Sequence, residues 1–303
     1  MILILLFGSL LYLSHSLDLP VLLTEHSLFL HRICLRSVPA LLENRESLEA
    51  LVCGKNIDDL EVKQLLIDTS LIHIFVVSGS HFLLLRNFFA RLVGKTPWLL
   101  IPLFIYAMVT LCQPPSLRAL AFIGLQEIAL RRKLFLSNLQ LVFLSALLCV
   151  AFFPQWILSR SLLMSLMAAT AMTTAEEIFD RKMAPGIRSF LSQSFMFFAM
   201  SFCLWGLSTL HPLSILMNVI LGPLIGTVLF PVGVLAIILP FTAPLFDRCM
   251  NCLLWLLQKS DVLLRASPDA TPLNIFSQWV LILALLLIAH RWAVRTRRAR
   301  YET

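Results

Sequence analysis

The stretch Leu71–Val93, LIHIFVVSGSHFLLLRNFFARLV, decides the fold of this chain because it is apolar enough and long enough to enter a lipid bilayer. Its first half nevertheless carries five small or polar residues, His73, Ser78, Gly79, Ser80 and His81. An unsatisfied polar group in hydrocarbon costs on the order of a few kcal/mol, so such groups face protein or a water-filled path. The stretch therefore predicts a segment that lines something crossing the membrane. The alternative is a helix whose histidines only pack against their neighbours.

The composition of the whole chain supports a membrane location. Of 303 residues, 59% are hydrophobic and 14% are charged, whereas soluble domains have about 45–50% apolar and about 25% charged residues. This balance excludes an ordinary soluble domain. The formal net charge of +7 mainly reports orientation, because Lys and Arg collect in cytoplasmic loops.

Helical apolar runs fill most of the remaining chain and predict an all-α polytopic membrane protein. They lie at about 97–112, 116–130, 136–153, 157–175 and 189–210, with a last span at 276–292. Several are shorter than the roughly 20 residues that a full span needs. Residues 212–240 are apolar but interrupted by glycine and proline, which predicts discontinuous helices in a re-entrant or broken hairpin. The fold class is thus a helical bundle with short, broken or re-entrant membrane helices.

Charge and pattern divide the chain into four parts. Residues 1–16 form a signal-like or anchor segment, and residues 17–70 hold more than half of the acidic residues at the spacing of amphipathic helices. The channel domain spans 71–292, and 293–303 is a basic tail. The positive-inside rule puts the tail in the cytoplasm and 17–70 outside it.

Local signals within 17–70 mark helix ends. Gly54 follows an apolar helical pattern and predicts a helix stop, and Asp58 or Asp59 then caps the next helix. Further on, residues 245–266 place their polar side chains on one arc, which indicates an interfacial or cavity-facing helix.

The cysteines indicate neither a disulfide framework nor a zinc site, because seven is an odd number and no paired C-x-x-C spacing occurs. Cys249 and Cys252 form a single C-x-x-C within an apolar helical run, where a redox role is not favoured.

Three runs of residues resemble the ComEC-type competence proteins. The first extends from Gly54 through Asp58-Asp59 and Asp68-Thr69 to Leu71–His81. The second, Pro115–Ala119, is similar to a family pattern in which proline and serine precede arginine and alanine. The third comprises His211-Pro212-Leu213-Ser214, Asn218 and Gly222-Pro223-Leu224. The resemblance covers about residues 28–240. Ser80 replaces the usual leucine, and a glutamine-containing family motif is degraded at 159–165.

The resemblance implies a channel in the bacterial inner membrane that passes single-stranded DNA into the cytoplasm during natural transformation. The family also carries an extracytoplasmic OB-like domain and, often, a metallo-β-lactamase-like domain. Residues 1–70 are too short for the first, and nothing after residue 240 offers the metal cluster of the second. We therefore expect three separate partners besides the DNA and the lipid membrane: an extracytoplasmic DNA receptor, a nuclease and a cytoplasmic ATPase.

A path for a polyanion needs polar groups that bind weakly enough to release it. The residues at 78–81 and His73 are expected to line this path, and Arg118 to attract phosphate at its mouth. For Arg118 the alternative is snorkelling toward headgroups. Asn218, Gly222 and Pro223 form either a helix break along the path or a packed kink.

No catalytic residue, cofactor or metal is expected. Two other functions compete with the DNA channel. The first is a permease for another anionic or lipid substrate. The second is an intramembrane hydrolase in which Ser78 or Ser80 acts with His81 or His73.

Overall fold

The computed structural model describes residues 19–69, 71–75, 78–94, 97–179, 183–205, 213–264 and 273–301. These residues form helices joined by short connections, and no strand occurs among them. The first half contains α2 Leu19–Ser37, α3 Arg45–Leu48, the π-helical turn η1 Glu49–Cys53, α4 Leu60–Asp68, α5 Ile72–Phe75, α6 Gly79–Val93, α7 Leu100–Val109, α8 Pro114–Arg131 and α9 Asn138–Phe152. The second half contains α10 Arg160–Ile178, α11 Pro185–Leu204, α12 Leu213–Leu224, the π-helical turn η4 Ile225–Leu229, α13 Phe230–Ile238, α14 Ala243–Leu264 and α15 Ile275–Tyr301. Short 3₁₀ turns precede α7, α10 and α14, at Pro97–Leu99, Pro154–Leu158 and Pro240–Thr242.

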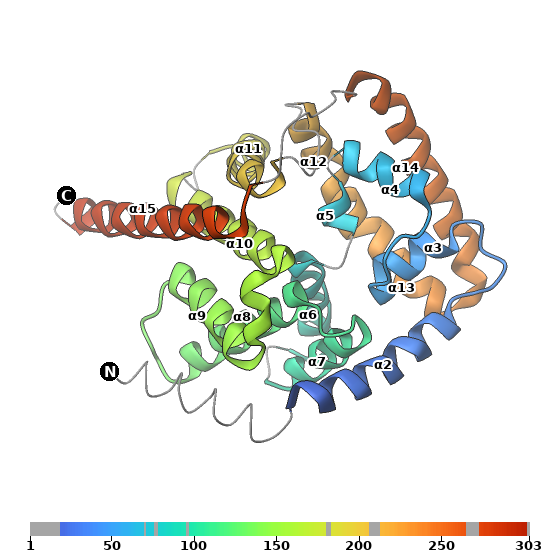
Figure 1. Ribbon diagram of the computed structural model, residues 1–303, viewed down its shortest axis with the longest axis horizontal. Coiled ribbons are helices and arrows are strands. Elements are labelled where there is room, and N and C mark those ends of the chain that lie inside the picture. The colour runs from blue at the N-terminus through green and yellow to red at the C-terminus, as the bar shows by residue number, and fades with distance from the viewer. Residues whose placement is uncertain are drawn as a thin grey trace.

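Three clusters of buried side chains hold the helices together. One joins α6, α7 and α8 around Phe82 and Leu103. A second joins α9, α10, α11 and α15 around Leu163 and Met167. The third packs the segment from Val38 to Phe75 against η4, α13 and α14. In Figure 1, α15 extends from one end of the molecule, α14 lies at the opposite end, and α6 and α8 lie between them.

The chain is an all-α membrane protein, as the composition predicted. Three described helical stretches are long and apolar enough to cross a membrane, Pro185–Leu204, Ile215–Ile238 and Ile275–Trp292. Leu100–Val109 and Asn138–Phe152 are apolar but shorter, as expected for a bundle with short membrane helices. Which end of each helix faces the cytoplasm stays a prediction.

The predicted break within 212–240 is wrong. Helical structure runs on from α12 through η4 to α13, although Pro223 lies inside α12. The π-helical turn follows the proline at once, and Thr227 Oγ1 donates to the Pro223 carbonyl at 2.7 Å. A proline removes only one backbone donor, and a wider turn accommodates its ring without ending the helix. The segment is therefore a bulged span and not a re-entrant or broken hairpin.

The segment 17–70 packs on the protein, and its predicted helix ends are confirmed. Gly54 ends η1 with a φ of 78°, a left-handed conformation that favours glycine. Asp59 caps α4, because its side chain accepts from the amides of Glu61 and Val62 at 2.9 and 3.2 Å.

The carboxylate of Glu49 anchors the turn after η1. Glu49 is buried and accepts from Arg45 at 2.7 Å and from Lys55 at 3.1 Å. The hydrogen bond to Glu49 raises the pKa of the Lys55 ammonium. Part of the acidic charge of this segment is thus neutralised by basic residues of the same segment.

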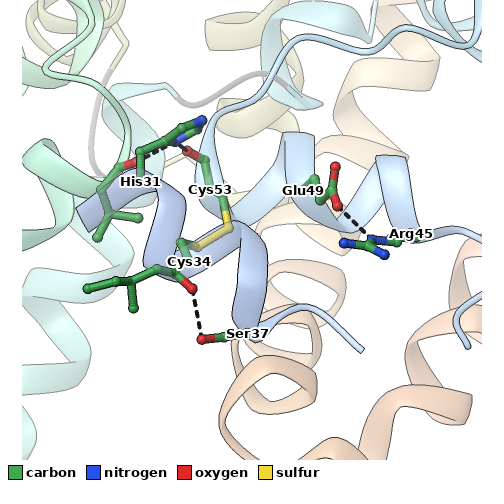
Figure 2. Close-up of a disulfide and its surroundings, with 8 residues drawn as sticks. His31, Cys34, Ser37, Arg45, Glu49 and Cys53 are labelled. Carbon is green, nitrogen blue, oxygen red and sulfur yellow. Dashed lines mark hydrogen bonds and ion pairs between the residues drawn. A yellow bond between two sulfur atoms is a disulfide. The ribbon is translucent and has the colours of Figure 1, made fainter. Parts of the chain in front are cut away.

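The expectation that the cysteines form no disulfide is wrong for one pair. Cys34 on α2 and Cys53 at the end of η1 are bonded, with their Cα atoms 5.9 Å apart (Figure 2). The two cysteines are 19 residues apart in the sequence, and only the packing of η1 beside α2 brings them within bonding distance. Cys249 and Cys252 are both free.

The first two polar residues of the arc predicted on α14, Asp247 and Asn251, contact protein, whereas Gln258 further along is exposed. Asp247 accepts from the backbone amides of Glu43 and Asn44 at 3.2 and 2.9 Å, and Asn251 exchanges hydrogen bonds with the side chains of the same two residues. These hydrogen bonds fix the connection between α2 and α3 to the start of α14.

Gly233 on α13 packs closely against the segment 17–70. A Cβ atom at this position would lie 2.9 Å from Leu48 Cδ1 and 3.0 Å from Val52 Cγ2. We expect Gly233→Val to lower the free energy of unfolding by about 1–3 kcal/mol, since overpacked cores pay costs of that size. Thermal unfolding of the purified chain measures the effect. The control is Gly124→Val on α8, where a Cβ would meet nothing within 4 Å; equal losses in both variants would contradict the packing argument.

Candidate functional site

The stretch Leu71–Val93 is not one helix. Ser78 has extended backbone angles, φ −125° and ψ 168°, and α6 begins at the next residue. His73 and His81 therefore do not lie on one continuous helix. His73 belongs to the short helix α5, and its side chain lies outside the described residues. What remains is a turn, Ser78–His81, at the start of a helix of 15 residues.

His81 holds this turn closed. Its side chain is fully buried, and its Nδ1 accepts the Ser78 backbone N–H at 3.1 Å. His81 stands at the third position of α6, where Glu or Gln commonly makes the same bond in a capping box. The ring also lies against Phe230, with 4.4 Å between ring centroids. Because Nδ1 accepts, the proton of a neutral ring sits on Nε2, which meets no partner among the described residues.

The hydroxyls of the two serines of the turn contact each other. Their Oγ atoms are 2.7 Å apart, and Ser80 is exposed. Ser78 Oγ lies 3.5 Å from His81 Nδ1, but that nitrogen is already occupied by the Ser78 amide. This arrangement differs from a nucleophile activated by a base, which requires a base nitrogen free to take the hydroxyl proton.

Arg118 on α8 lies directly over the turn. A Cβ atom at Gly79 would be 3.3 Å from an Nη atom of Arg118 and 3.5 Å from Ala119 Cβ. Glycine at 79 thus permits the close approach of α6 and α8. At this contact, two of the runs that resemble the competence family meet: the run that ends in Leu71–His81, and Pro115–Ala119.

The guanidinium of Arg118 is buried without a negative partner. Only 6% of the residue is exposed, and its Nε donates to Ser165 Oγ at 2.8 Å. None of the ion pairs among the described residues involves Arg118. The expected alternative, snorkelling toward headgroups, needs an exposed charge and does not fit this burial.

The three residues on α12 lie in different surroundings. Asn218 is buried with 4% of its surface exposed, Gly222 is half-buried and Pro223 is exposed. These residues connect to the turn through the continuous helix, because Phe230 further along it packs against His81. Asn218 stands 12 residues before Phe230, and at about 1.5 Å per residue the two Cα atoms are roughly 18 Å apart. The turn and Arg118 therefore form the compact part of the site, and Asn218 lies some distance along the same helix.

Two residues of the site were missed in the sequence. Ser165 ends the stretch 159–165 that reads as a degraded motif, yet its hydroxyl binds Arg118. Phe230 is one of 22 phenylalanines, and nothing in its local sequence distinguishes it. The position of Ser165 inside a motif-like stretch was the one usable signal.

A second set of contacts ties the segment 17–70 to the start of α8. His31 Nδ1 lies 3.1 Å from the carbonyl oxygen of Cys53 and 2.9 Å from that of Val109 (Figure 2). Since carbonyls only accept, this nitrogen carries a proton and is shared between them. Gln113 Nε2 donates to the Gly54 carbonyl at 2.8 Å. The turn between α7 and α8, which precedes Arg118, is therefore fastened to the disulfide-bonded segment.

The fold and the site define a helical membrane protein with a buried, unpaired cation at a polar helix start. A family model described as competence protein matches residues 55–298. The match covers most of the chain, and the chain therefore belongs to the competence protein family. The family match extends beyond residue 240, where the resemblance seen in the sequence ended, and includes α14 and most of α15.

Among curated relatives, an uncharacterized protein of Aquifex aeolicus (strain VF5) is 28% identical over 194 residues. The matched region is 61% of this chain and 45% of that protein, so this chain spans less than half the length of the relative. No solved structure matches the chain.

Proposed function

We propose that this chain is an inner-membrane channel that passes single-stranded DNA into the cytoplasm during natural transformation. Membership of the competence family supports a role in DNA uptake. The observation that carries the finer proposal is the burial of Arg118, without a carboxylate, against the turn Ser78–His81. A buried cation is costly unless an anion neutralises it, and the phosphate backbone of DNA supplies anions at regular spacing.

The proposed strand passes the exposed side of the turn, where Ser80 and Arg118 meet it. One cation offers attraction without a deep trap, since conduction requires that each contact be released. The proposal includes the partners expected from the sequence: a separate DNA receptor outside, a nuclease that supplies the single strand and a cytoplasmic ATPase that pulls it.

A serine hydrolase is not favoured by the geometry. His81 Nδ1 accepts the Ser78 amide at 3.1 Å and the imidazole is fully buried, so the ring is engaged in holding the turn. A permease for another anion remains the competing proposal, and the experiment below separates it from the DNA channel.

The test follows labelled duplex DNA from the surface into the cytoplasm of cells that lack the gene. Deletion should stop cytoplasmic arrival while surface or periplasmic DNA still accumulates, and the wild-type gene should restore it. Arg118→Gln should restore about tenfold less, because a hydrogen bond to a charged group contributes about 1.5–3 kcal/mol.

The matched control is Arg86→Gln on α6, since Arg86 is bonded to Gln126 at 2.9 Å and lies about two turns along α6 from the Ser78–His81 turn. This variant should restore uptake to within about twofold of the wild type, because it removes a guanidinium that lies outside the proposed site. Normal arrival of DNA in the cytoplasm of the deletion strain would contradict the channel proposal and favour the permease.

A further inference from the structure

We propose that the start of α6 and the guanidinium of Arg118 together form a binding site for a single phosphate group. The inference deepens the proposed function and rests on it for the identity of the ligand. It names the chemical group that the site takes, a tetrahedral phosphate oxyanion, independent of base and sugar. Recognition of this kind suits a strand of any sequence.

The helix supplies the first donors. The first amides of an α-helix, here those of Gly79 and Ser80, have no acceptor inside the helix. The aligned peptide dipoles add positive potential at this end, and phosphate groups bind there in many proteins. The Ser78 amide is already used by His81, which keeps the turn in one conformation.

Arg118 supplies the independent indication of a ligand. It is 94% buried, the complement of its 6% exposure, and its only hydrogen bond among the described residues runs from Nε to Ser165. The terminal nitrogens have no described acceptor, and one of them lies 3.3 Å from the place of a Cβ on Gly79. Ser165 thus fixes the guanidinium so that its free edge faces the start of α6. Arginine binds phosphate through two such nitrogens at once.

The remaining wall is polar and open. The hydroxyls of Ser78 and Ser80 are neighbours at 2.7 Å, and either can turn to donate to an oxyanion. Ser80 is exposed, so a phosphate can approach from that side. Glycine at 79 has no side chain of its own between the start of α6 and the guanidinium.

A purely structural role for Arg118 predicts something different. If the residue only joined α8 to α10 through Ser165, its replacement would lower stability in the same way with or without phosphate. A binding site predicts instead that phosphate stabilises the wild type, by the amount that its affinity and concentration dictate, and stabilises the more weakly binding variant less.

The experiment measures binding of radiolabelled inorganic phosphate to the purified full chain in detergent, with sodium chloride keeping the ionic strength constant. Wild type should bind saturably, and Arg118→Gln should bind about tenfold more weakly, as the loss of a charged donor implies. Arg86→Gln, which is bonded to Gln126, should match the wild type. Non-saturable binding by the wild type, or equal binding by Arg118→Gln, would overturn the proposal.

Gly79→Ala is the second variant, and its thermal unfolding is measured beside its phosphate binding. The added methyl group would stand 3.3 Å from an Arg118 nitrogen, inside the site. We expect weaker phosphate binding by a protein that still unfolds in one cooperative transition. Undiminished binding would show that the phosphate lies elsewhere.

The two proposals fail in different ways. If phosphate binds as described but the deletion strain still takes up DNA, the channel proposal falls and the phosphate site stands. If deletion blocks uptake but no phosphate binds at Gly79 and Arg118, the site falls and the channel proposal stands.

Discussion

Replacing Cys34 by serine is expected to lower the free energy of unfolding by about 3 kcal/mol. The disulfide closes a loop with a sequence separation of 19 residues, and the chain-entropy relation gives about 3 kcal/mol for a loop of that length. Cys53→Ser should give the same loss, and the double variant no more than either single variant, because all three remove one cross-link.

The effect should extend beyond the loop itself. The carbonyls of Cys53 and Gly54 accept from His31 and Gln113, and the same His31 nitrogen reaches Val109 at 2.9 Å. Loosening Cys53 therefore also loosens the turn that leads into α8 and its Arg118.

Thermal unfolding of the purified chain, with and without a thiol reductant, measures the loss. Reductant should lower the unfolding temperature of the wild type to that of Cys34→Ser and leave the unfolding temperature of the variant unchanged. The control is Cys252→Ser, since Cys252 is free and exposed; this variant should unfold like the wild type. A Cys34→Ser protein as stable as the wild type would contradict the role assigned to the disulfide.

The second large effect concerns His81. Truncating this fully buried side chain leaves a cavity beside Phe230 and removes the acceptor of the Ser78 amide. We expect His81→Ala to lose about 3 kcal/mol of unfolding free energy, within the range for large-to-small changes in cores. His81→Gln should lose about 1 kcal/mol, because a glutamine at this position of a helix can accept the same amide.

Unfolding measurements on both variants, paired with the DNA uptake assay, separate two roles for His81. If the residue holds the turn, uptake should follow stability, and His81→Gln should restore both. A His81→Ala protein of normal stability that takes up no DNA would instead favour the original interpretation, in which the imidazole itself lines the path. The structure favours the first outcome because the ring is buried and its Nδ1 is occupied.

Several features followed from the sequence for local physical reasons. The apolar runs correctly predicted helices α7 to α10 to within three residues, and the run 189–210 overlaps α11 with an offset of four to six residues, because burial of apolar side chains in lipid or protein requires a hydrogen-bonded backbone. Gly54 and Asp59 mark helix ends through their own backbone and side-chain preferences. The family resemblance rested on residues at Leu71–His81 and Pro115–Ala119, and the family match includes both.

Other features depended on local hydrogen bonds that the apolar pattern does not reveal. Pro223 looks like a break in any helix, but the helix continues through a π-helical turn in which Thr227 donates to the Pro223 carbonyl. Ser78 looks like the middle of an apolar helix, but its backbone is extended and its amide donates to His81 at the start of a new one.

The sequence by itself determined that this protein is an all-α membrane protein of the competence family, because composition, helical periodicity and short motifs act over a few residues. Only the tertiary structure decided that Cys34 bonds Cys53 and that Arg118 is held by Ser165 over Gly79. These contacts join residues 19 to 47 positions apart in the chain. Their partners are selected by the packing of whole helices, which no local pattern encodes.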